Sequence, residues 1–281
     1  MNIGILIFLL FLQVFNGYAQ DIEQWSRFEL VFKRKSIKNG YKDIDLSCTF
    51  SNKDTSFVVQ GFYDGSDTFK IRFMPQQTGP WHYVTSSNVG DLDRKTGNFN
   101  CIKASGNNHG LVRVSKVHNF KYADEHPYSP FGTTAYAWTQ MADSLEEITL
   151  RSLKTSSFNK VRMCVFPKSY DLVREAPIMF PFVLKAINKD DKGKDVYVWD
   201  FDNFNPAFFQ HLENRIDDLD KLGIQADSML FHPYDKRCWG FDAMPNEVNI
   251  RYLTCLVARL AAYRNVWWSM ANEWNYVKAK S

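Results

Sequence analysis

The pattern of hydrophobic and polar positions divides the chain into two regions. Between residues 24 and 117, apolar and polar residues alternate in short segments, which turn sequences such as Asn39-Gly40 and Thr78-Gly79-Pro80 separate. Alternation with a period of two is typical of half-buried antiparallel strands. We expect strands at Phe28–Phe32, Ile44–Phe50, Phe57–Phe62, Thr68–Phe73 and Trp81–Thr85. Many short strands without a helical pattern predict a β-sandwich.

The second region replaces this alternation with apolar runs separated by helical patterns. The runs that predict strands are Phe131–Trp138, Phe158–Phe166, Ile224–Phe231 and Val266–Met270. The last run has no polar alternation and predicts a strand buried on both faces, as in a parallel sheet. The long segment between the second and third runs is expected to be a loop. Four strands separated by helices predict an α/β (TIM-type) barrel or an open parallel sheet.

Capping signals place the helices between these strands. Ser144 followed by Glu147 predicts a capping box, with Ser144 as the N-cap. Asn205-Pro206 predicts the start of the second helix and Gly223 its end. The third helix is expected over Glu247–Tyr263, and its predicted buried face consists of Ile250, Leu253, Val257 and Leu260.

These patterns give a domain organisation. We expect a signal peptide at residues 1–19, a β-sandwich domain at 20–112, a linking hairpin at 113–130 and a partial (β/α)8 barrel at 131–281. A complete barrel takes about 250 residues. The last region therefore predicts only about the first half of a barrel, and we expect a truncated chain.

The first twenty residues have the pattern of a secretion signal. Ile3–Phe15 is nearly all apolar, and Gly17-Tyr18-Ala19 supplies small residues before the expected cleavage point. The apolar run is too short for a comfortable membrane span. We therefore expect a secreted or periplasmic protein without a membrane span after signal cleavage.

Composition narrows the expected partners. The formal charge is +3 and both signs are interspersed, so no basic stripe indicates nucleic-acid binding. Aromatic residues make up 16% of the chain, which fits sugar recognition as well as a large core. Among the five cysteines, Cys48 and Cys101 could form one disulfide. No zinc-binding spacing occurs, and neither a metal nor a cofactor is expected.

Candidate site residues gather where the predicted parallel strands end. Asn272 and Glu273 follow the last apolar run between bulky aromatics, where a barrel enzyme places its chemistry and where flanking Trp side chains would desolvate a general acid. An ordinary polar turn is an equally good interpretation. Arg162 lies inside an apolar strand and needs a carboxylate partner, which Glu273 could supply. His232 ends the third strand, as a sugar contact or as a packing histidine. The predicted mouth loops supply further substrate contacts at Trp138, Tyr234 and Trp239.

Two resemblances follow from these motifs. Glu23-Gln24-Trp25, Gly61–Gly65, Arg72–Pro75 and Gly79-Pro80-Trp81 resemble an N-terminal β-sandwich domain of unknown function that precedes catalytic barrels in bacterial glycoside hydrolases. In that domain Trp25 and Trp81 could form a sugar platform, but packing is favoured.

The second region resembles apiosidase-like barrels of the clan A retaining glycoside hydrolases. Phe131–Trp138, Phe158–Arg162 and Trp267–Glu273 match their strands one, two and four. The resemblance implies that Glu273 is the acid/base and that Asn272 contacts the sugar hydroxyl next to the anomeric carbon. It also implies a carboxylate nucleophile on strand seven, which these residues do not include.

The sequence therefore predicts a secreted retaining glycoside hydrolase that acts on a plant or algal polysaccharide or oligosaccharide. Because the expected nucleophile is missing, we expect residues 1–281 to be inactive on glycosides. The alternative is a non-catalytic carbohydrate-binding protein. An acyl or peptide hydrolase is disfavoured, since no GxSxG motif occurs.

Overall fold

The computed structural model describes residues 20–35, 38–169, 176–232 and 238–274. The predicted signal peptide and Tyr234 lie outside these residues. Within the described ranges, no helix has the length and apolar character needed to cross a membrane.

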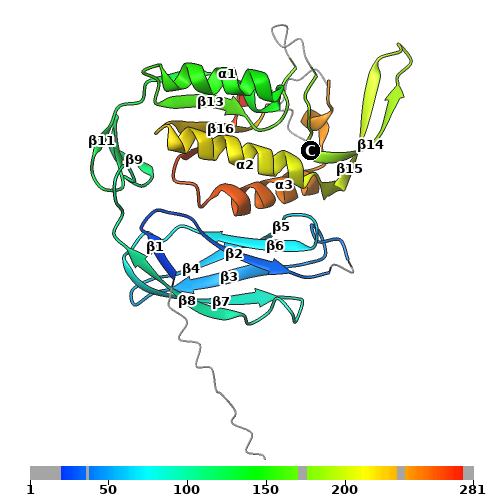
Figure 1. Ribbon diagram of the computed structural model, residues 1–281. Coiled ribbons are helices and arrows are strands. Elements are labelled where there is room, and N and C mark those ends of the chain that lie inside the picture. The colour runs from blue at the N-terminus through cyan, green and yellow to red at the C-terminus, as the bar shows by residue number, and fades with distance from the viewer. Residues whose placement is uncertain (1–19, 36–37, 170–175, 233–237, 275–281) are drawn as a thin grey trace, which may run out of the picture.

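The elements follow one another along the chain as Figure 1 shows. The strands are β1 (Gln20–Glu23), β2 (Phe28–Lys33), β3 (Leu46–Ser51), β4 (Ser56–Gln60), β5 (Phe62–Tyr63), β6 (Thr68–Phe73), β7 (Gly79–Ser87), β8 (Thr96–Ile102), β9 (Val112–Lys116), β10 (Asn119–Tyr122), β11 (Pro127–Tyr128), β12 (Gly132–Thr134), β13 (Lys160–Cys164), β14 (Phe182–Lys189), β15 (Asp195–Phe204), β16 (Gln225–Phe231) and β17 (Val266–Ala271). The helices are α1 (Asp143–Lys154), α2 (Pro206–Lys221) and α3 (Asn246–Leu260), with short 3-10 turns η1 (Trp138–Gln140) and η2 (Phe241–Ala243).

The N-terminal region consists of two sheets around one core. One has the strand order β1-β8-β7-β3-β4 and the other β2-β6-β5. Their buried side chains form one aromatic cluster that includes Phe28, Phe50, Phe73, Trp81 and Phe99. Trp81 is 1% exposed, so it packs in the core and offers no sugar platform. The predicted β-rich region is confirmed, although β8 was missed because Gly97, Asn98 and Asn100 interrupt its apolar pattern.

The suggested disulfide between Cys48 and Cys101 is wrong in this structure, where both are buried free thiols. Cys48 lies opposite Thr85 and Cys101 opposite Gly79, on either side of β7. A strand between them and an offset along it keep the sulfurs apart, because a disulfide needs Cα atoms within about 7 Å.

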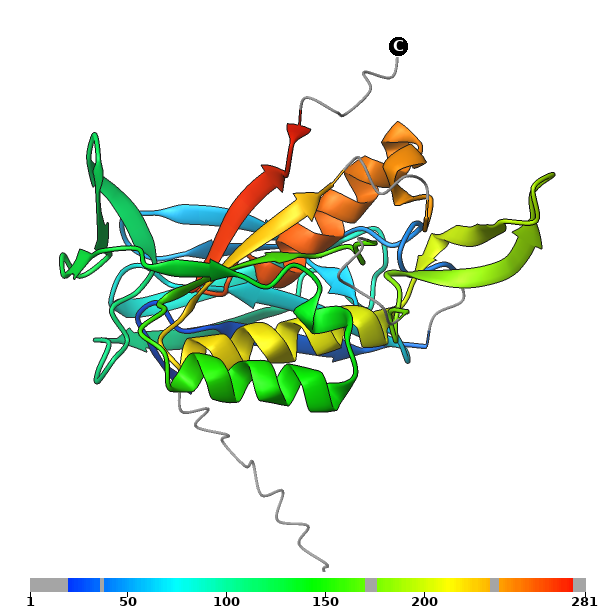
Figure 2. The ribbon, with the colours of Figure 1, turned by 90° about the horizontal axis from the view of Figure 1, so that it is seen from above.

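The second region has a four-stranded parallel sheet with the order β12-β13-β16-β17. Parallel strands in sequence order are also the arrangement from which a barrel is built. Figure 2 shows α1 and α2 side by side along one side of this sheet. Val161, Met163 and Ala226 are fully buried towards the helices.

Three local predictions in this region are wrong. Helix α1 begins at Asp143 after Ala142, and no side chain caps it, so the Ser144 capping box does not form. Strand β12 covers only Gly132–Thr134 of the predicted Phe131–Trp138. The expected loop after β13 contains the antiparallel hairpin β14–β15.

The predicted face of α3 is wrong in part: Ile250 is 66% and Val257 45% exposed, whereas Leu260 is 1% exposed and Leu253 packs against the core as predicted. The side chains that α3 buries include Val248, Tyr252 and Leu256. By contrast, α2 begins as predicted, because the Asn205 side chain accepts a hydrogen bond from the Ala207 N–H.

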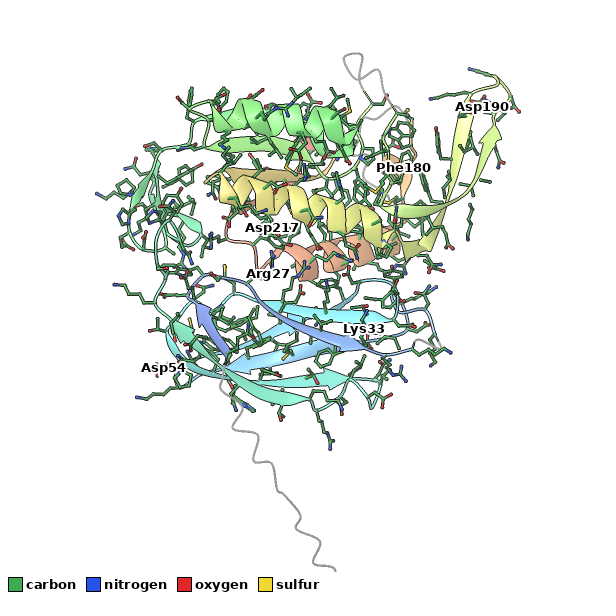
Figure 3. All side chains as sticks on the ribbon, in the orientation of Figure 1. Arg27, Lys33, Asp54, Phe180, Asp190 and Asp217 are labelled. Atoms are coloured by element: carbon green, nitrogen blue, oxygen red, sulfur yellow. The ribbon has the colours of Figure 1, made fainter. Side chains whose placement is uncertain are left out.

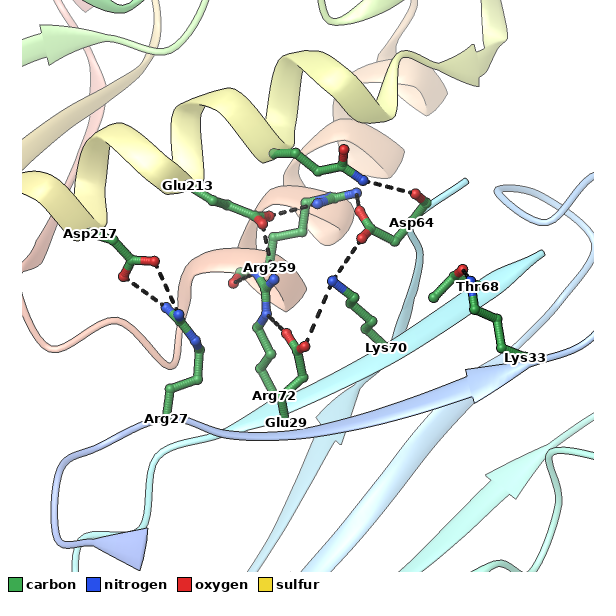
Figure 4. Close-up of polar contacts among 11 residues, drawn as sticks. Arg27, Glu29, Lys33, Asp64, Thr68, Lys70, Arg72, Glu213, Asp217 and Arg259 are labelled. Atoms are coloured by element: carbon green, nitrogen blue, oxygen red, sulfur yellow. Dashed lines mark hydrogen bonds and ion pairs between the residues drawn. The ribbon is translucent and has the colours of Figure 1, made fainter. Parts of the chain in front are cut away.

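Charged side chains join the N-terminal sheets to α2 and α3 (Figure 4). Arg72 on β6 reaches Glu213 on α2 at 2.9 Å, and Arg259 on α3 reaches the same carboxylate at 2.6 Å. Arg259 also pairs with Asp64 at 2.5 Å. Both arginines are almost fully buried, at 6% and 1% exposure. We call Asp64, Arg72, Glu213 and Arg259 the interface cluster.

Two further charged residues contact the interface cluster. Glu29 accepts a 2.6 Å hydrogen bond from Arg72, and Lys70 lies 2.9 Å from Asp64. Burial alone would raise the pKa of Asp64, but Arg259 and Lys70 outweigh burial and hold that pKa below its ordinary value. A second, half-exposed pair, Arg27 with Asp217, spans the same interface (Figure 3). The two regions are therefore joined by paired charges rather than by a loose linker alone.

Candidate functional site

Polar side chains cover the face of the parallel sheet opposite the helices. Asp227 on β16 is opposite Arg162 on β13 and Trp267 on β17. Its carboxylate lies 2.8 Å from Lys160 and 3.9 Å from Arg162, and it accepts a 2.5 Å hydrogen bond from the Ser269 hydroxyl. Asp227 is only 4% exposed. Because these contacts come from the two neighbouring strands, Asp227 holds the polar side chains of β13, β16 and β17 together.

A groove of about 560 Å³ opens along this polar face. Its lining includes Lys160, Arg162, Asp227, Trp267 and Ser269, together with Phe120 from the linking hairpin. The Lys160 ammonium also lies 4.2 Å from the centre of the Trp267 ring. The groove thus combines charged groups with an aromatic wall, a combination suited to a polar ligand with apolar faces.

Asn272 and Glu273 follow directly after β17. The Asn272 N–H donates to the Phe231 carbonyl at 3.0 Å, which holds the chain beside β16. The Asn272 side-chain oxygen accepts a hydrogen bond from Arg162 at 3.3 Å. Glu273 is exposed and adopts a left-handed backbone with φ of +49°. The structure therefore brings Asn272 and Arg162 together and leaves the Glu273 carboxyl open to solvent.

Two expectations for these residues need correction. The carboxylate partner of Arg162 is Asp227 and not Glu273, because Asp227 lies directly opposite it in the strand register. Glu273 forms no ion pair within the described residues. The flanking tryptophans do not desolvate it either, since Trp274 is itself 75% exposed.

His232 has the packing role rather than the sugar-contacting one. It is 5% exposed, and its Nε2 lies 3.2 Å from the Phe166 carbonyl oxygen. Burial lowers the pKa of His232 to about 4. The imidazole is therefore neutral at pH 7.

The predicted tryptophan contacts are buried. Trp138 is 5% exposed, and its indole N–H donates to the Met163 sulfur at 3.4 Å. Trp239 is 8% exposed, and its ring packs against Phe180 and Tyr197. Neither ring is open to a sugar in this structure, because both belong to the buried core cluster. Tyr234, the third predicted contact, lies outside the described residues.

Sequence reasoning missed Asp227, Lys160 and Ser269. The available signal was the period of two in Lys160-Val161-Arg162 and Gln225-Ala226-Asp227, where polar residues alternate with fully buried ones. The strand expected to be buried on both faces, Val266–Met270, is instead partly exposed, with Trp268 41% and Met270 61% exposed. Alternation shows instead that one face of each strand is polar and can bind a ligand.

These observations define a class of two-region protein. A β-sheet region is joined to a parallel α/β region, and an Asn–Glu pair lies at the carboxyl end of the parallel sheet. Residues 21–88 match a family described as a domain of unknown function, DUF5060. No curated protein matches the chain significantly.

The chain is similar to a crystal structure of a Bacteroides vulgatus ATCC 8482 protein that is provisionally assigned as a glycoside hydrolase. The two share 56% sequence identity with a TM-score of 0.90, and the match covers 93% of this chain and 51% of that one. This chain therefore spans about half the length of that relative.

Two other glycoside hydrolase structures are much less similar. A family 5 enzyme from Bacteroides vulgatus ATCC 8482 is 14% identical with a TM-score of 0.42, over 60% of this chain and 36% of that one. A family 39 enzyme from Bacteroides cellulosilyticus WH2 is 8% identical with a TM-score of 0.25, over 89% of this chain and 42% of that one. With these TM-scores and identities, the two structures indicate nothing further about this chain.

Proposed function

We propose that this chain is part of a secreted or periplasmic glycoside hydrolase that acts on a plant or algal polysaccharide or oligosaccharide. The observation that carries the proposal is its 56% identity, over 93% of its length, to the Bacteroides vulgatus protein. The Asn272–Glu273 pair at the carboxyl end of β17 supports it, because barrel enzymes place catalytic groups at that end of their strands.

In this proposal Glu273 is the acid/base of a retaining mechanism. It protonates the leaving oxygen and later activates water, while a second carboxylate attacks the anomeric carbon from about 5–5.5 Å away. Asn272 contacts the neighbouring sugar hydroxyl, and Arg162 orients the Asn272 amide by donating to its oxygen at 3.3 Å. The remainder of the sheet, completed as a (β/α)8 barrel, supplies the nucleophile.

Residues 1–281 alone are proposed to be inactive on glycosides. The carboxylate on the polar face of the described sheet, Asp227, is 4% exposed and already bound by Lys160, Arg162 and Ser269. Arg162 and Asp227 are opposite each other, four residues before β16 ends at Phe231. Asp227 is therefore too deep and too strongly paired to serve as the second carboxylate.

Binding and turnover together test this proposal. Isothermal titration of the purified chain with plant and algal oligosaccharides is expected to find a ligand that Asn272→Ala binds at least about tenfold more weakly. The exposed Asn188→Ala on β14 is the matched control and keeps full affinity. Failure of every carbohydrate to bind contradicts the proposal. If residues 1–281 hydrolyse a glycoside and Glu273→Gln abolishes that activity, the expected inactivity is wrong, but Glu273 has the proposed acid/base role.

A non-catalytic carbohydrate-binding protein remains the second candidate, because Glu273 is exposed and has no ion-pair partner in the described part of the chain. The two candidates differ in the turnover expected of a protein with the full length of the Bacteroides vulgatus relative. A glycoside hydrolase loses turnover in the Glu273→Gln variant, whereas a binding protein shows no turnover to lose.

A further inference from the structure

Two histidines and an aspartate converge in the segment that connects the two regions, away from the candidate site. His109 Nδ1 lies 2.7 Å and His126 Nδ1 2.9 Å from the same Asp124 oxygen, Oδ2. One ligand atom from each residue lies within 4.8 Å of the other two. The imidazole rings are 4.6 Å apart between centroids. Three side chains with metal-ligating atoms thus face one point.

The backbone holds these three residues in place. His109 precedes β9, while Asp124 and His126 form the turn between β10 and β11. The Asp124 N–H donates to the His109 carbonyl at 3.3 Å, which joins the two segments. The His126 N–H donates to Asp124 Oδ1 at 3.2 Å. One carboxylate oxygen is therefore fixed by the turn, and the other is directed at both imidazoles.

The charge balance around the cluster favours a cation. Within the described residues, the Asp124 carboxylate contacts the His109 and His126 rings and forms no ion pair with a lysine or arginine, so no fixed positive charge opposes a metal ion there.

The other metal-ligand grouping among the described residues lacks these properties. It consists of Asp143, Glu146 and His211. The fully buried Glu146 lies 2.8 Å from His211 and 3.8 Å from the Arg215 guanidinium. Arg215 already supplies positive charge there and would repel a metal ion. This group is an ion-pair network between α1 and α2.

We propose that His109, Asp124 and His126 bind a divalent transition-metal ion, with Zn²⁺ the best match. Two imidazole nitrogens and one carboxylate oxygen form a typical three-residue zinc ligand set, which leaves a fourth position for water. Ligand distances of about 2.0–2.2 Å require the donor atoms to separate to about 3.3 Å in tetrahedral geometry. His126 permits this small opening because its side chain is 65% exposed.

The position of the site indicates that a bound metal would join two segments of the chain. Gly110, next to His109, packs so closely on Trp25 that an added Cβ would lie 2.5 Å from the indole. A metal bound by His109 and by the β10–β11 turn therefore fixes the connecting hairpin to the N-terminal sheets. Because binding favours the folded state only, the ion raises the free energy of unfolding.

Titration of the untagged, EDTA-treated chain with Zn²⁺ tests the site. We expect one high-affinity ion per chain and a higher melting temperature with Zn²⁺ than without it. His126→Ala and Asp124→Asn each remove a proposed ligand, so each should weaken Zn²⁺ binding by more than the roughly tenfold to hundredfold that the loss of an outer-shell partner costs. His118→Ala, an exposed histidine in the turn between β9 and β10, is the matched control and should bind like the parent.

Two results would overturn the proposal. One is the absence of Zn²⁺ binding above the level of a nonspecific protein. The other is binding that His126→Ala and Asp124→Asn leave unchanged. Since His126 is exposed, its variant is expected to fold, so weaker binding by His126→Ala reports the loss of a ligand. Neither measurement depends on the glycoside hydrolase proposal.

Discussion

Two charged clusters in this molecule have similar composition but different surroundings. The interface cluster pairs Arg72 and Arg259 with Glu213 and Asp64, and all four side chains are buried. At the polar face of the parallel sheet, Arg162 is 37% exposed and reaches Asp227 only at 3.9 Å. The first cluster is closed on every side, whereas the second leaves polar atoms facing a groove.

The comparison teaches how to separate structural from functional charges. A buried pair whose partners are all satisfied cannot interact with a ligand, and its main energetic signature is the cost of breaking it. A partly open group such as Arg162 costs less to remove and keeps donors available for binding. Four changes, ordered by their expected effect on the free energy of unfolding, test this distinction.

Breaking the interface cluster should have the largest effect. Arg259→Met leaves Glu213 and Asp64 partly unpaired in a buried environment, which should lower the free energy of unfolding by about 3–5 kcal/mol. Arg27→Met removes a half-exposed pair at the same interface and should cost about 1 kcal/mol or less. Urea denaturation followed by tryptophan fluorescence measures both. Equal losses in the two variants would contradict the closed-cluster interpretation.

Acidification should have the second largest effect, through His232. Its pKa is lowered to about 4 by burial, from an ordinary value of 6.5. Between these two pH values the unfolded chain binds the additional proton, so stability falls as the pH decreases from about 6.5 to 4, by up to about 3 kcal/mol. Urea titrations across this range measure the loss. A parallel loss of the same size in His232→Gln would show that other groups cause it.

Removing Arg162 should affect binding more than stability. Arg162→Ala deletes a partly exposed contact to Asp227, with a cost of about 1 kcal/mol or less. It also releases the Asn272 side chain, so carbohydrate affinity should fall about tenfold. Calorimetric titration and urea denaturation of the same preparation compare the two effects. A stability loss as large as that of Arg259→Met would place Arg162 in the structural class.

Glu273→Gln should have the smallest effect on stability. The side chain is exposed and has no ion-pair partner within the described residues, so the free energy of unfolding should change by no more than about 0.5 kcal/mol. Thermal and urea denaturation measure this difference. A loss above 1 kcal/mol would show that the Glu273 carboxylate supports the fold.

Periodicity predicted most of the elements because it reports which face each residue buries. The strands around Phe28, Phe50 and Phe73 follow from local alternation, and the start of α2 follows from Asn205-Pro206. Strand β14 was missed because every residue after Phe182 in it is exposed, so its pattern lacks a clear buried face.

The site was only partly predictable. The position of Asn272 and Glu273 at the end of β17 is a local property of the chain, and the structure agrees with it. The partner of Arg162 depends on strand register, which brings Asp227 from another segment of the sequence. Burial of Trp138, Trp239 and His232 depends on tertiary packing, which the position of a residue near a strand end does not determine.

The structure also explains two of the sequence motifs in the N-terminal domain. Asp64 and Arg72 lie in two of the motifs that carry the resemblance, and both belong to the interface cluster. These motif residues therefore serve the attachment of the domain to α2 and α3 rather than sugar binding.

The left-handed backbone at Glu273 bears on why a glutamate stands there. Glycine or asparagine adopts this conformation at lower cost, by roughly 1 kcal/mol for glycine. Replacement by glycine should therefore make the chain slightly more stable while it deletes the carboxyl group. This cost is compatible with the proposed acid/base role of Glu273, which requires the carboxyl group whatever the backbone conformation.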